Sequence, residues 1–235
     1  VVAEFEKKKY PLTIEIVGEG QVAEKVIKPG APNDYNSGTI VELEALSGQS
    51  WEFLEWQVDL TGTQNPKQIT INSPKTVRAV FVTAQPFYLD NNGVTIKARD
   101  WVTAGTTGDL DGVTYTAVDN QTLQSMAIDG QDLSKVVTTL VTNMSSLAAI
   151  SNGKLCNYNI TRWDVSNVTS MRNMLRGCAN FNHDIGSWDV SKVIDMEDMF
   201  HLALNFNQDI GNWNVSNVTN MKRMFYHAYK FNQDI

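Results

Sequence analysis

Acidic side chains recur along the second half of the chain at a spacing that could pair carboxylates for acid–base chemistry. Asp164 and Asp189 lie 25 residues apart, and so do Asp184 and Asp209. A carboxylate that recurs at the same position of every repeat is expected to stabilise the repeat. A catalytic pair would instead occur once and break the repeat symmetry. We therefore interpret these aspartates as structural residues.

Other candidates for chemistry are equally weak. His183, His201 and His227 occupy three different places in the pattern and lack metal-ligand spacing such as HExxH. The strings DNNG (90–93) and DLDG (109–112) suggest calcium but lack the ligand series of a calcium loop, so hairpin turns are the better interpretation. Nucleophile-elbow, Walker and dinucleotide-binding motifs are missing. We expect no enzyme, no cofactor and no metal site.

The 25-residue spacing belongs to a repeat at the end of the chain. Residues 181–205 and 206–230 are identical at 13 of 25 positions without a gap, and residues 156–180 follow the same register. A fainter copy, VTNMSSL, occupies 141–147. A short fixed period of this kind is typical of a solenoid, in which each repeat buries its apolar side chains against its neighbours.

Each repeat has the patterns of one short strand and one short helix. Trp188 and Val190 alternate with polar residues, which predicts a strand with one buried face. The apolar residues of 196–203 stand at i, i+3, i+4 and i+7, a helical stripe, and Asp195 before them is of a type that caps helices. We predict a right-handed coil of leucine-rich-repeat type in which three tryptophans are buried one above another: Trp163, Trp188 and Trp213.

These residues also suggest a family. The string FNQDIGNWNVSNVTNMKRMF resembles the BspA-type leucine-rich repeat of bacterial surface proteins, over roughly 156–235. The stretch from FYLDNNG to DNQTL (87–123) is similar to the segment that leads into such solenoids, with two hairpin signals and a short helix from Gln121. We expect residues 85–130 to cap the solenoid, which then occupies 131–235.

Residues 6–84 have a different sequence pattern. Short runs such as LTIEIVG and TIVELEAL alternate apolar and polar residues, which predicts strands, and glycines mark the turns between them. The segment resembles the divergent internalin B-repeat, a small β-grasp-like spacer module of bacterial surfaces. The opening residues VVAEF align with VRAVF (77–81) at the end of this module. We therefore interpret residues 1–5 as the tail of a preceding module and the chain as part of a longer tandem protein. The fold class expected is α+β multidomain.

Composition narrows the class of partner. The formal net charge of −7 disfavours nucleic acid, which attracts clusters of Lys and Arg. The sequence contains no run of 18 apolar residues, so it predicts no membrane-spanning helix. Cys156 and Cys178 stand at core positions of one repeat, where two interpretations stay open: two small buried hydrophobic residues, or a disulfide.

Two functions remain, and the resemblance places both outside the cell. In the first, the solenoid is an adhesion segment that binds an extracellular protein or glycan. In the second, it is a passive stalk. On the helix side, Arg172/Asn173, Glu197/Asp198 and Lys222/Arg223 change sign from repeat to repeat, which we interpret as solvated faces with weak ion pairs. The candidate ligand-binding residues are the exposed polar positions beside the buried strand residues: Arg162, Asp164, Ser166, Ser187, Asp189, Ser191, Asn212, Asn214 and Ser216.

Overall fold

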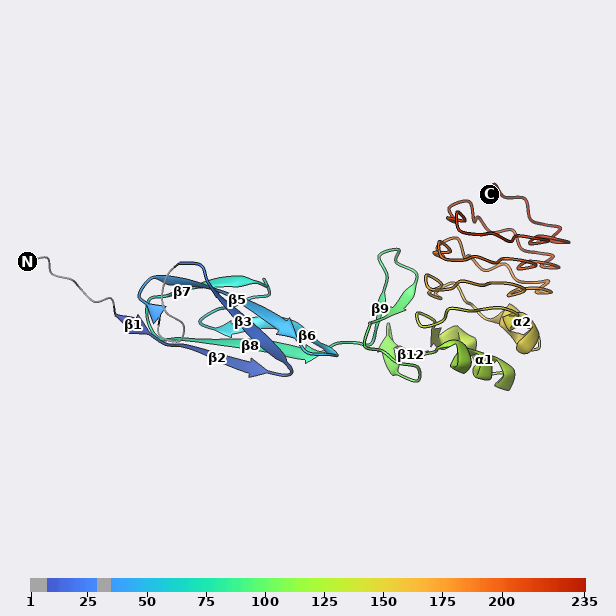
Figure 1. Cartoon of the computed structure of the whole chain (residues 1–235). Coiled ribbons are helices and arrows are strands. Elements are labelled where there is room, and N and C mark those ends of the chain that lie inside the picture. The colour runs from blue at the N-terminus through green and yellow to red at the C-terminus, as the bar shows by residue number, and fades with distance from the viewer. Residues whose placement is uncertain (1–7, 29–34) are drawn as a thin grey trace, which may run out of the picture. The chain divides into compact units, whose positions relative to one another are not determined.

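A computed structural model of the chain describes residues 8–28 and 35–235 (Figure 1). The chain divides into two compact units between Ala84 and Gln85. The expected tail of a preceding module, residues 1–5, lies outside the described residues.

The first unit consists of strands joined by turns, and its described part contains no helix. Strands β2, β8 and β6 form one sheet, in which β2 runs parallel and β6 antiparallel to β8, and β3, β5 and β7 form an antiparallel sheet. The short strands β1 and β4 pair with each other. The strands are β1 (Lys9–Tyr10), β2 (Leu12–Val17), β3 (Gly20–Val26), β4 (Tyr35–Asn36), β5 (Thr39–Ser47), β6 (Trp51–Val58), β7 (Lys67–Ile71) and β8 (Lys75–Thr83).

The core of the first unit takes alternate side chains from both sheets. Val41 and Leu43 of β5 and Val77 and Ala79 of β8 are fully buried in one cluster. Trp56 lies in the same cluster, and its indole Nε1 donates a hydrogen bond to the Gln64 carbonyl at 3.0 Å. The alternation in the sequence therefore corresponds to one buried face per strand.

The second unit begins with two hairpins at the predicted turns. β9 (Phe87–Leu89) pairs with β10 (Ile96–Ala98), and β11 (Thr107–Leu110) pairs with β12 (Val113–Ala117). Asp111 and Gly112 both have positive φ, at 53° and 76°, which a two-residue hairpin turn favours. β13 (Val136–Val137) adds to β12 in parallel.

A helix leads from the hairpins into the repeats. α1 (Asn120–Asp129) begins one residue before the predicted start, because the Asp119 carboxylate accepts a hydrogen bond from the Thr122 amide at 2.8 Å. It buries Leu123 and Ala127 in the cluster that continues through the repeats. Short elements follow: η1 (Leu133–Lys135), α2 (Leu147–Ile150) and η2 (Lys154–Asn157).

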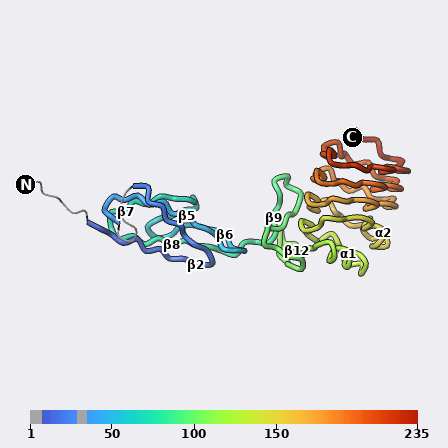
Figure 2. Tube along the Cα trace, in the orientation of Figure 1, coloured from blue at the N-terminus to red at the C-terminus, as the bar shows by residue number. Residues whose placement is uncertain are grey.

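Beyond residue 157 the chain runs in turns that stack on one another (Figure 2). Parallel bridges join equivalent residues of successive turns, from Asn143 to Ser170, Asp195 and Asn220. Trp163 and Trp188 are buried, and the Trp188 and Trp213 rings stack with centroids 6.5 Å apart. The sequence period is therefore the period of the stack.

The predicted strand and helix of each repeat do not form. Residues 188–190 and 196–203 are irregular or in turns. A helix would require each amide to bond four residues back, but Asp198 and Phe200 donate instead to Lys222 and Met224 of the next turn, at 3.0 and 2.9 Å. Asp198 itself has a φ of 55°. The apolar residues of 196–203 are therefore buried without a helix. Alternate amides of this segment donate to carbonyls of the next turn instead.

Candidate functional site

The polar positions predicted to line one exposed face do not form a strand, and they are not all exposed. Asp164 is only 1% exposed, which contradicts its assignment to an open surface. Arg162 is half-buried, because its guanidinium contacts the Tyr115 hydroxyl at 3.1 Å and the Asp111 carboxylate at 3.3 Å. The first repeat therefore offers little free surface here.

The β9–β10 hairpin explains the burial of Asp164. The Ile96 amide donates to the Arg162 carbonyl at 2.9 Å, which lays the hairpin beside this turn. One Asp164 oxygen accepts hydrogen bonds from the Ser166 amide and hydroxyl, and the other has no partner among the described residues. The hydrogen bond joins residues 66 positions apart in the chain (162 − 96), so a local sequence pattern does not predict this cover.

The later repeats keep their part of the face open. Asp189, Asn212, Asn214 and Ser216 are exposed, and Ser187 and Ser191 are half-buried, as is Ser166 in the first repeat. The Asp189 and Asn214 side chains also accept the amide two residues ahead, at 3.0 and 3.2 Å. These side chains therefore shape the turn as well as facing solvent.

A disulfide joins Cys156 to Cys178, with Cα atoms 5.1 Å apart. It links the start of the first complete repeat to its last turn. Disulfides form and persist in oxidising compartments such as the cell exterior. The bond is consistent with an extracellular protein.

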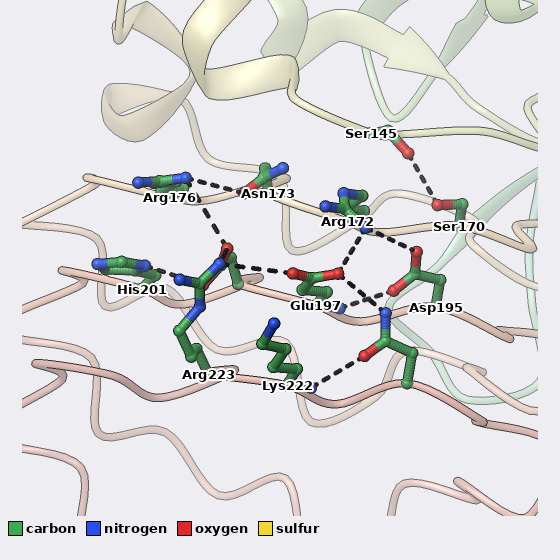
Figure 3. Close-up of polar contacts among 12 residues, drawn as sticks. Ser145, Ser170, Arg172, Asn173, Arg176, Asp195, Glu197, His201, Lys222 and Arg223 are labelled. Carbon is green, nitrogen blue, oxygen red and sulfur yellow. Dashed lines mark hydrogen bonds and ion pairs between the residues drawn. The ribbon is translucent and has the colours of Figure 1, made fainter.

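Charged residues of successive turns form the ion pairs that the alternation of sign predicted, but the two carboxylates at the centre of this network are buried (Figure 3). Glu197 and Asp198 are only 8% and 1% exposed, which contradicts the interpretation of a solvated face at these two positions, whereas Arg172, Lys222 and Arg223 are exposed. Arg172 of the turn before reaches Glu197 at 2.5 Å, and Arg223 of the turn after reaches Asp198 at 2.9 Å. Two carboxylates are thus held between basic residues of both neighbouring turns.

Further contacts complete this network. Asn220 donates to the Glu197 carboxylate at 3.0 Å, and the His201 ring nitrogen lies 2.9 Å from Asp198. Arg176 lies 3.8 Å from Asp198. Buried charges require such partners, because leaving one unpaired is costly. The only sequence signal for this network was that the charge at equivalent positions, 25 residues apart, changes sign from one repeat to the next.

The network keeps both carboxyl groups acidic. The hydrogen bond from Asn220 lowers the pKa of Glu197, and the Arg172 charge adds to this against the effect of burial. Burial alone would raise the pKa of Asp198, but the His201 hydrogen bond and the Arg223 charge outweigh it, so that this pKa is also lowered. Both groups are therefore ionised at neutral pH and attract the guanidinium groups around them.

The remaining candidates for chemistry are accounted for by local contacts. The Asp90 carboxylate of the DNNG turn pairs with Lys97 at 2.9 Å, which lowers the pKa of Asp90. The Asp184 and Asp209 side chains accept the amides of Gly186 and Gly211 at 3.0 and 2.9 Å. In residues 8–28 and 35–235, no group of three His, Cys, Asp or Glu side chains could hold a metal ion. These aspartates act on their own turns.

Among the described helices, none has both the length and the apolar character needed to cross a membrane.

Comparison with protein families gives two partial matches. Residues 10–85 match the model described as the divergent InlB B-repeat domain. Residues 142–235 match the model described as a Mycoplasma protein of unknown function, DUF285. Neither description names a catalytic activity, and no curated protein and no solved structure matches the chain. The chain therefore combines two segments similar to domain families, and the domains suggest a surface protein.

Proposed function

We propose that this chain is a non-catalytic recognition segment of an extracellular bacterial surface protein, whose repeats form a leucine-rich-repeat-type solenoid. Residues 85–130 would cap the solenoid, and a β-grasp-like spacer module would precede it. The ligand would be a protein or a glycan. The observation that carries the proposal is the polar face of the second and third repeats, which stays exposed while the β9–β10 hairpin covers the first.

The face suits weak, additive contacts. Each turn offers three polar side chains, such as Asn212, Asn214 and Ser216, which are all exposed. A contact of this kind gains strength when several turns act together on one partner. Binding should therefore depend steeply on the number of turns.

Binding of the purified chain to glycan arrays and to immobilised matrix proteins tests the proposal. Deleting 181–205 joins residue 180 to 206 in the same register, so one turn is removed without a new junction. We expect weaker binding after this deletion and after Asn212→Lys with Ser216→Lys, which place bulky charges on exposed positions. Lys230→Glu, an exposed change elsewhere in the last turn, is the matched control.

A passive stalk is the second candidate, and one observation favours it. The Asp189 and Asn214 oxygens already hold their own turns, and Glu197 and Asp198 already bind neighbouring turns. If every binding signal persists after the repeats are removed, the polar positions serve the stack alone and the stalk is the correct function.

A further inference from the structure

A small cavity lies where the β9–β10 hairpin meets the first two repeats. Its volume is about 20 Å³, which gives room for one group the size of a water molecule. Ser187 and Asp189 of its wall also belong to the polar face of the second repeat, so the cavity adjoins that face. The other charged or hydroxyl-bearing residues of the wall come from the hairpin and the first repeat: Asp90, Thr95, Lys97, Asp164 and Ser166.

The wall of the cavity includes a buried carboxylate with an unused oxygen. Asp164 is 1% exposed, and its Oδ1 atom accepts the Ser166 amide and hydroxyl at 3.0 and 2.7 Å. Its Oδ2 atom has no hydrogen-bond partner among the described residues. Burying a carboxylate oxygen without a donor is costly. A donor placed in the cavity would remove this cost.

Lys97 does not supply the donor, because its ammonium group is already paired. It forms an ion pair with Asp90 at 2.9 Å, and this hydrogen bond raises the pKa of Lys97 against the effect of burial, with a further contribution from the Asp164 charge. Asp90 and Lys97 thus neutralise each other. Within the described part of the chain, neither Asp164 nor Asp189 has an ion-pair partner. The wall therefore carries two uncompensated carboxylates.

Size and charge together define the group that fits. A primary ammonium group is a compact positive charge with three N–H donors, whereas a guanidinium group is a larger planar fork. A neutral hydroxyl group would fit the space but would leave both carboxylates without a counter-charge. A metal ion is not expected, because no group of three His, Cys, Asp or Glu side chains in residues 8–28 and 35–235 could hold one.

We propose that this cavity binds a primary ammonium group, supplied by a lysine side chain of a protein that docks on the exposed polar face. The Asp164 Oδ2 atom and the Asp189 carboxylate accept hydrogen bonds from the ammonium group. The inference rests on the proposed recognition function, and it names a protein with an accessible lysine as the ligand.

A titration of the purified chain, followed by NMR, tests the site without any partner protein. The probe is lysine blocked at its backbone amine and carboxyl group, and its Nε-acetylated form is the uncharged control. We expect the ammonium probe to give a saturable shift of the Ser166 amide signal, because this amide donates to the other oxygen of Asp164. Blocked arginine and potassium chloride, at equal ionic strength, should give no saturable shift.

Three variants assign the response to the cavity. Asp164→Asn keeps an oxygen for Ser166 and removes the unpaired charge, so it should fold and should bind the lysine probe about tenfold or more weakly. Asp189→Asn changes an exposed residue and should also weaken binding. Asp129→Asn, at the exposed end of α1, is the matched control and should bind as the original chain does.

The outcomes separate the site from the recognition function. No saturable shift with the lysine probe, or an equal shift with potassium, blocked arginine or the acetylated form, overturns the site. A protein found to bind the chain is then acetylated at its lysines. Unchanged binding after acetylation overturns the lysine contact while recognition stands. A chain that responds to the lysine probe but binds no protein keeps the ammonium site and loses the protein partner.

Discussion

The three equivalent tryptophans allow a direct measurement of one hydrogen bond within a repeated environment. Trp163 Nε1 donates to the Leu133 carbonyl at 3.1 Å, whereas the buried Trp188 Nε1 has no partner among the described residues. The two side chains are 2% and 3% exposed. Replacing either with Phe removes the same atoms, so the difference between the two variants contains the hydrogen bond together with the stacking of Trp188 on Trp213.

The expected magnitudes follow from these contacts. Trp163→Phe loses a hydrogen bond worth about 0.5–1.5 kcal/mol and leaves its acceptor without this donor. Trp188→Phe loses no hydrogen bond and removes an unsatisfied buried N–H group. We therefore expect Trp163→Phe to destabilise the repeats by about 1–2 kcal/mol more than Trp188→Phe. Trp188→Ala should cost about 3–5 kcal/mol, as for other large-to-small core changes.

Calorimetry of the whole chain measures these differences. Trp163 and Trp188 lie in the second compact unit, so the unfolding transition of the first unit serves as an internal reference. A Trp188→Phe variant as unstable as Trp163→Phe would show that the Trp188 indole has a partner after all. A Trp188→Ala cost below about 1 kcal/mol would place this ring outside the core and refute the stacking of the repeats.

Three further outcomes are expected. Asp198→Asn should destabilise the repeats by about 1–2 kcal/mol in urea unfolding, because it weakens the charge-assisted contacts of Asp198 with His201 and Arg223, and Lys230→Gln at an exposed position is the control. The folded-state pKa of Asp198 is lowered, so its stabilisation should be present above its unfolded pKa of about 4 and lost as the pH falls through its folded value, which unfolding measured against pH would detect. Reduction of the Cys156–Cys178 bond should lower the melting temperature of the second unit alone, and a shift in both transitions would contradict this.

The sequence by itself determined the repeat, its period and which residues of successive turns lie side by side. Residues 25 apart bridge one another because each turn can bury its apolar side chains only against the next. The Asn92-Gly93 and Asp111-Gly112 turns and the start of α1 could also be predicted, because they depend on local backbone chemistry.

Only the tertiary structure decided how the turns are built and which polar groups are buried. Alternate amides bond to the next turn, so the helical stripe at 196–203 forms no helix. Asp164 is covered by a hairpin from far earlier in the chain, and Glu197 and Asp198 are buried by arginines of two other turns. Whether Cys156 and Cys178 bond depended on the path of the chain between them. These outcomes depend on contacts between distant segments, and a local pattern of residue types does not record which segments meet.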